Sequence, residues 1–153
     1  MNENRVHIID ALRDADDLME ILASGAVVPI VVTGSSMSPY LKHGRDTVRL
    51  IKPDSLKKGK ILFFRRKSGE FILHRLRKIL PDGKLLMNGD AQSWCEIIDM
   101  DQVLGEVISL RRNGREIKPD GIGSRLWNIL WYPTRAFRPA IWRTWAFVRR
   151  IFG

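Results

Sequence analysis

Hydrophobic positions divide the chain into three parts that differ in their spacing. Residues 6–23 carry apolar side chains near helical spacing, with acids on much of the other face, and Gly25 follows them. This spacing predicts an amphipathic helix that ends at Gly25. Between Val27 and Leu110 the apolar positions form short runs separated by turn residues. From Ser124 onward they return to helical spacing, interrupted by two prolines.

The middle part predicts a mainly β core. Its apolar runs are short, rich in β-branched and aromatic residues, and bounded by glycine, proline and aspartate, as is typical of strands. We expect strands at Val27–Thr33, Thr47–Ile51, Ile61–Arg65, Phe71–Leu80, Lys84–Asn88 and Val103–Leu110. Pro29 predicts an edge position for the first strand, because proline cannot donate to a neighbour. Consecutive short strands favour this fold class over alternating βαβ units.

The composition is that of one folded domain, with 153 residues, 44% of them hydrophobic and 28% charged. Cys95 is the single cysteine, so an internal disulfide is excluded and a reducing compartment is favoured. The sequence predicts neither a metal site nor a cofactor. The polar first 20 residues do not resemble a signal peptide. The uncharged run Leu22–Leu41 contains glycines and prolines, which favour a strand and a turn over a membrane-spanning helix.

Charge is distributed unevenly along the chain, whose net charge is +9. Residues 1–121 hold all 17 acids, whereas residues 122–153 hold six arginines, four of the five tryptophans and no acid or lysine. We therefore divide the chain into a domain with an N-terminal helix, residues 1–121, and a basic helical tail, residues 122–153. In the tail, Ile141, Trp145, Val148 and Phe152 recur at helical spacing and predict one apolar face.

Candidate chemistry begins at Ser36, in the serine-rich stretch Gly34–Pro39 that follows the first apolar strand. A serine hydroxyl is a poor nucleophile until a neighbouring base takes its proton. A turn after a strand can present such a hydroxyl beside free backbone N–H groups, which would stabilise an oxyanion. By local chemistry alone, an ordinary serine-rich loop is the more common interpretation.

The surrounding residues resemble the nucleophile box of type I signal peptidases and of LexA-type self-cleaving repressors. The matching positions are Val32–Leu41, Gly44, Asp46 and Val48. In that box the serine directly before methionine attacks the substrate, so the resemblance implies Ser36 as nucleophile. It covers roughly residues 27–111 and implies a signal-peptidase/LexA-type β core. Arg45 departs from the pattern by separating the glycine from the aspartate.

The resemblance also implies the base. Bacterial signal peptidases and the repressors have a lysine on the partner strand, whereas the corresponding segment of this chain has His74 followed by Arg75. This His-Arg pair resembles the Ser-His branch of the endoplasmic reticulum and archaea. Histidine titrates near neutral pH, so His74 can accept the serine proton as a neutral imidazole. A structural strand histidine is the alternative interpretation.

An imidazole base needs a partner that fixes its tautomer and orientation. Asn88-Gly89-Asp90 resembles the acidic box of the family, which implies that Asp90 orients His74, although the same three residues also form a good turn. Some members have another acid about six residues later, where this chain has Glu96. For the oxyanion, the backbone N–H of Ser36 is the expected donor, helped by the Ser35 hydroxyl or by backbone groups alone.

The resemblance therefore implies a serine endopeptidase that cleaves a leader or signal segment of a peptide or protein substrate. The alternative is a catalytically inactive peptidase-fold module that binds membrane or nucleic acid through its basic tail. For residues 122–153 we expect peripheral membrane contact, with indoles at headgroup level and arginines on anionic lipid. Packing onto the β core is a second interpretation, and nucleic-acid binding a less favoured third. The expected location is cytoplasmic, at the inner membrane surface.

Overall fold

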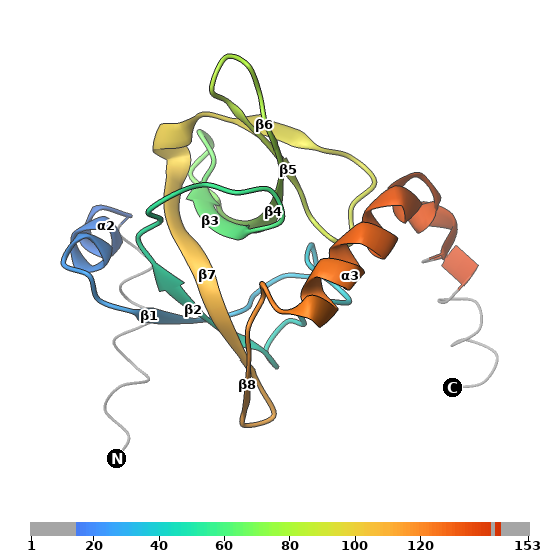
Figure 1. Cartoon of the computed structure of the whole chain (residues 1–153), viewed down its shortest axis with the longest axis horizontal. Coiled ribbons are helices and arrows are strands. Elements are labelled where there is room, and N and C mark those ends of the chain that lie inside the picture. The colour runs from blue at the N-terminus through green and yellow to red at the C-terminus, as the bar shows by residue number, and fades with distance from the viewer. Residues whose placement is uncertain (1–14, 142, 145–153) are drawn as a thin grey trace.

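The computed structural model describes residues 15–141, 143 and 144, and its main element is an antiparallel sheet (Figure 1). Its strands are β1 (Val28–Val31), β2 (Thr47–Ile51), β3 (Ile61–Arg65), β4 (Phe71–Ile79), β5 (Leu85–Asn88), β6 (Glu96–Ile98), β7 (Val103–Arg112) and β8 (Arg115–Ile117). The order across the sheet is β1-β2-β7-β3-β4-β5-β6, and β8 pairs with β7. The mainly β class predicted from the sequence is confirmed.

Short helical elements lie on either side of the strands along the chain. The N-terminal helix is α2 (Ala15–Ala23), and the earlier part of its predicted range lies outside the described residues. The C-terminal part contains α3 (Ile122–Trp131), which continues into the 3-10 turn η3 (Tyr132–Phe137); a second 3-10 turn is η2 (Met100–Gln102). No helix in the described ranges is both long and apolar enough to span a membrane.

The predicted strands match the observed ones closely in the centre of the chain. Two strands, Thr47–Ile51 and Ile61–Arg65, have the predicted bounds, and β1 lies at the sheet edge as Pro29 indicated. The sequence did not predict β6 and β8. Each has only three residues, too few to show an alternating pattern, and each exists because a longer neighbour offers it hydrogen bonds.

The core lies on both faces of the central strand β3, which runs between β4 and β7. Ile61 and Phe63 belong to one buried apolar cluster, whereas Leu62 and Phe64 belong to another. Because alternate strand residues point to opposite faces, this strand is buried on both sides. The sheet curls around these clusters, and α2 covers the first of them with Leu18 and Leu22 (Figure 1).

The first part of the tail packs onto the β core. Trp131 donates its indole N–H to the Asp90 carbonyl at 2.6 Å, and the Tyr40 hydroxyl donates to Ser124 Oγ at 2.9 Å. Arg138 is fully buried. The expectation that the tail directs its indoles and arginines outward therefore fails for Trp127, Trp131 and Arg138. Most of the apolar face predicted from Ile141 onward lies outside the described residues.

Candidate active site

Ser36 lies in a tight turn after β1, and its backbone is held on two sides. Before it, Gly34 adopts a positive φ of 78° and donates its N–H to Nδ1 of His43 at 3.0 Å. At Ser36 itself, the carbonyl oxygen accepts the N–H of Ala91 at 2.8 Å. After it, Met37 is buried in the core. The serine-rich stretch is therefore an anchored turn, and the side chain of His43 is one of its anchors.

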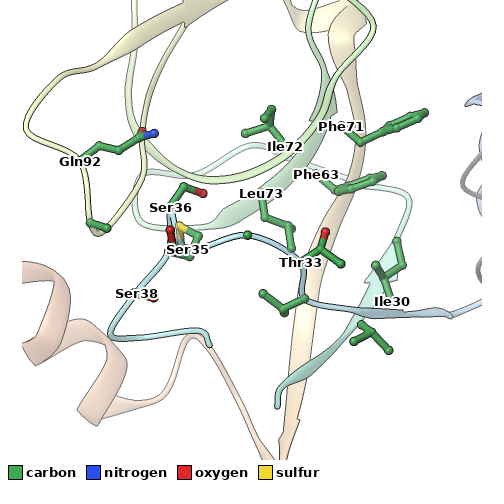
Figure 2. A pocket seen from close by; sticks show the side chains of 15 residues that line it. Ile30, Thr33, Ser35, Ser36, Ser38, Phe63, Phe71, Ile72, Leu73 and Gln92 are labelled. Carbon is green, nitrogen blue, oxygen red and sulfur yellow. The ribbon is translucent and has the colours of Figure 1, made fainter. Parts of the chain in front are cut away.

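The Ser36 turn forms one wall of a cavity of about 930 Å³. Figure 2 shows the Ser36 hydroxyl directed into this cavity, opposite apolar side chains of β3 and β4 such as Phe63 and Leu73. Two strand edges border the same space. Among the described strands, β1 pairs only with β2, and Phe71–Leu73 of β4 precede the part of that strand that pairs with β5. The cavity therefore offers free backbone edges next to a serine hydroxyl.

His74 is buried next to this turn, on β4. Its Nδ1 lies 2.7 Å from Oε1 of Glu96, close enough for an ion pair but without the alignment of a hydrogen bond. The rings of Phe64 and Trp94 pack edge-on against the imidazole, with centroids 5.9 and 6.3 Å away. The imidazole is thus fixed on one nitrogen by a carboxylate and on its faces by aromatic rings.

Glu96 is itself held in place by Arg66. Arg66 donates from Nε and Nη2 to the two carboxylate oxygens, at 2.7 and 2.8 Å. Burial raises the pKa of Glu96, but the contacts of its carboxylate with His74 and Arg66 outweigh that effect and lower the pKa to about 2. Glu96 is therefore ionised at neutral pH and can stabilise a protonated His74.

Gly89 brings the nucleophile turn and the imidazole together. A Cβ atom on Gly89 would lie 2.6 Å from the Ser36 carbonyl oxygen and 2.9 Å from Nε2 of His74. The Ser36 carbonyl oxygen and the His74 imidazole therefore both border the space that a side chain at position 89 would occupy. The predicted Ser36–His74 hydrogen bond is not formed: Nε2 of His74 has no hydrogen-bond partner among the described residues.

Substitution of Gly89 by alanine is expected to separate the two groups. The added methyl group would meet a backbone oxygen at 2.6 Å, well inside van der Waals contact, so the turn or the imidazole must shift. Misplacement of reacting groups by about 1 Å can lower a rate by about 100-fold. We therefore expect the rate at which Ser36 reacts with a fluorophosphonate to fall by a similar factor, measured by mass spectrometry.

The matched control for this substitution is Gly123→Ala. Gly123 lies in α3, where an added Cβ would have no neighbour within 4 Å and where alanine is the better helix former. Gly123→Ala should react at the wild-type rate. Equal rates for the Gly89→Ala and Gly123→Ala variants would show that the site does not require the absence of a side chain at position 89.

Asp90, the predicted partner of His74, lies elsewhere. Its carboxylate accepts hydrogen bonds from Arg75 at 2.8 and 3.2 Å and from Arg77 at 3.0 Å. Arg75 and Arg77 are alternate residues of β4, so they share one face of the strand while His74 points to the other. The structure therefore does not bring Asp90 to the imidazole. Glu96, the alternative acid, is the residue that it brings there.

The loop that carries Gly89 is held in place by the buried side chain of Arg138. Its guanidinium donates to the carbonyl of Gly89 at 3.1 Å, to Oδ1 of Asn88 at 3.2 Å and to the carbonyl of Gln92. Burial lowers the pKa of Arg138, and the Asp90 carboxylate partly offsets this shift. Sequence patterns gave no signal for this role, because Arg138 is 50 residues from Asn88 and lies in a stretch read as a basic surface.

The turn also offers donors for a developing oxyanion. In the described part of the chain, the backbone N–H groups of Ser35 and Ser36 have no acceptor. Ser35 is exposed and lies beside Ser36 in the cavity wall. Free N–H groups next to a serine hydroxyl are the arrangement that stabilises negative charge on a substrate oxygen.

Comparisons with known proteins give no assignment for these residues. No protein-family model matches the chain, and no curated protein matches it significantly.

Proposed function

We propose that this protein is a serine endopeptidase of signal-peptidase type, with a signal-peptidase/LexA-type β core. Its substrate would be a peptide or protein from which it cleaves a leader or signal segment. The observation that carries the proposal is the pairing of buried His74 with the partly buried Glu96, beside the backbone of Ser36. The resemblance of Val32–Leu41 to the nucleophile box of that family supports the same residue as nucleophile.

In the proposed reaction, Nε2 of His74 takes the proton of the Ser36 hydroxyl as Oγ attacks the scissile carbonyl carbon. The backbone N–H groups of Ser35 and Ser36 stabilise the resulting oxyanion. Protonated His74, held by ionised Glu96, then gives its proton to the leaving amine, and the substrate remains bound to Oγ as an ester. Water completes the cycle by the same steps, with His74 again as base.

The substrate would bind as an extended segment. The free edges of β1 and of Phe71–Leu73 both border the cavity, and an extended peptide can pair with an unoccupied strand edge. Apolar side chains such as Ile30 and Phe63 would contact alternate residues of that peptide. Together with the single cysteine, the basic tail supports the cytoplasm, at the inner membrane surface, as the proposed location.

The function can be tested without a known substrate. The purified protein is incubated with a diverse mixture of peptides and, separately, with a fluorophosphonate, and products and modified residues are mapped by mass spectrometry. We expect cleavage within peptides and modification at Ser36. Ser36→Ala should lose both, whereas Ser35→Ala, the adjacent serine, should retain modification at Ser36.

Two outcomes would reject the proposal. Cleavage that persists in Ser36→Ala would assign the activity to another residue. A folded wild type that neither cleaves peptides nor reacts with the probe would favour the inactive binding module, for which the unformed Ser36–His74 hydrogen bond is the supporting observation.

A further inference from the structure

α3 is amphipathic, but its polar groups face the core and its aliphatic side chains face outward. The side that meets the core carries Ser124, Trp127, Asn128 and Trp131, whose polar atoms hydrogen-bond to core residues. The outward side carries large apolar side chains, which continue into η3. Their exposed fractions are 80% for Ile122, 52% for Leu126, 65% for Ile129, 70% for Leu130 and 69% for Phe137. We call these five residues the α3 ridge.

This arrangement differs from the usual surface helix, which buries its aliphatic side and exposes its polar side. Single exposed apolar residues are ordinary, but a contiguous row on one helix face marks a contact surface. The spacing of Ile122, Leu126, Ile129 and Leu130 places them on one face of α3. The ridge is therefore a surface that lacks a partner within the described part of the chain.

Positive charge adjoins the ridge. A cavity of about 440 Å³ between residues 57–60 and the start of α3 is lined by Lys57, Lys58, Arg125 and the ridge residue Ile129. Lys57 and Lys58 are exposed, and among the described residues neither forms an ion pair with a carboxylate. Asp120 is the one acid among the residues that line this cavity.

The other cations of the cavity are already engaged. Lys60 pairs with Glu106 at 2.5 Å, Arg75 pairs with Asp90, and Arg125 donates to the carbonyl oxygen of Asp120 at 3.1 Å. The excess positive charge beside the ridge thus resides chiefly on Lys57 and Lys58. Residues 122–153 add six arginines and no acid to the same end of the chain.

We infer that the α3 ridge, together with Lys57 and Lys58, docks the protein on an anionic phospholipid bilayer. Apolar side chains enter the acyl boundary while ammonium groups meet lipid phosphates, which is how interfacial helices bind membranes. A nucleic acid fits less well, because its bases stack on aromatic rings. Trp127 and Trp131 stack on each other and face Asp90, whereas the outward residues are mostly aliphatic.

Vesicle flotation tests this inference with two double variants. The wild type should float with vesicles of phosphatidylcholine and phosphatidylglycerol, and far less with phosphatidylcholine alone. Ile129→Gln with Leu130→Gln should lower the partition coefficient on the anionic vesicles at least tenfold. Lys57→Gln with Lys58→Gln should remove most of the preference for anionic vesicles. Circular dichroism verifies that each variant is folded.

The matched controls change the same residue types elsewhere. Ile97→Gln alters an exposed isoleucine of β6, and Lys78→Gln with Lys84→Gln removes two lysines outside the ridge and its cavity. Both controls should float as the wild type does. The inference fails if the wild type does not float, if the ridge variant floats equally, or if the wild type shifts an oligonucleotide instead. A wild-type dimer that the ridge variant dissociates without lipid would assign the ridge to a second copy.

This inference does not depend on the proposed peptidase activity, because none of its residues lines the cavity at Ser36. Ser36→Ala should float like the wild type. Failure of flotation would leave the peptidase test unaffected, and failure of that test would leave flotation unaffected.

Discussion

Glu96→Gln is expected to lower the rate of Ser36 modification and of peptide hydrolysis by about 10⁴-fold. In serine hydrolases, an acid behind the histidine fixes the imidazole tautomer and stabilises its protonated form, and its amide analogue costs about that factor. Glu96 is the acid that lies within reach of the imidazole, with Oε1 at 2.7 Å from Nδ1. The amide keeps the size of the side chain but removes the negative charge that protonated His74 requires.

The control is Glu70→Gln. Glu70 also pairs with Arg66, at 3.2 Å, but it is largely exposed and does not contact His74. A rate close to that of the wild type is expected for this variant, which separates the effect of losing a carboxylate near Arg66 from the effect at the imidazole. If Asp90→Asn instead abolished the reaction while Glu96→Gln reacted within about twofold of the wild type, Asp90 would be the orienting acid.

Asp90→Ala is expected to lower the free energy of unfolding by about 3–5 kcal/mol, the usual cost of leaving buried charges without their partner. Arg75 and Arg77 both pair with this carboxylate, and their side chains are almost fully buried. Burial already lowers the pKa of Arg77 to about 10, although Asp90 opposes that shift. Since typical domains are stable by about 5–15 kcal/mol, this loss is a large share.

Urea unfolding monitored by tryptophan fluorescence measures this loss. Asp54→Ala is the control, because Asp54 is exposed and, within the described ranges, makes no hydrogen bond or ion pair. A change of at most about 0.5 kcal/mol is expected there. A midpoint for Asp90→Ala equal to that of Asp54→Ala, at an unchanged slope, would mean that the arginines find other partners and that Asp90 does not hold the structure.

The sequence predicted the strands that carry the site better than the contacts within it. β3 and β4 were found because their apolar runs are long enough to show a pattern and end at turn residues. The choice between Asp90 and Glu96 depends on which face of β4 each acid meets. The path of the loop after β5 determines that face, and no local sequence pattern predicts this path.

The tail shows a second limit of sequence reasoning. Tryptophans and arginines without acids indicated a surface, because burial of such polar groups is costly without partners. Here the partners exist, but they come from distant segments: Asp90 accepts the indole of Trp131 at its carbonyl, and the loop at Gly89 accepts Arg138. The composition favoured membrane contact, with packing onto the β core as the second interpretation, and it did not indicate that Trp131 and Arg138 would contact the core.

The dependence of the Gly89 loop on Arg138 has a consequence for biosynthesis. A ribosome completes Ser36, His74 and Glu96 well before it adds Arg138, and a domain generally folds as a unit. A nascent chain therefore contains the proposed nucleophile and base before it contains the residue that holds the loop beside them. For the proposed peptidase, we expect hydrolytic competence to appear only after Arg138 has docked on this loop, so that an unfinished chain does not cleave its neighbours during translation.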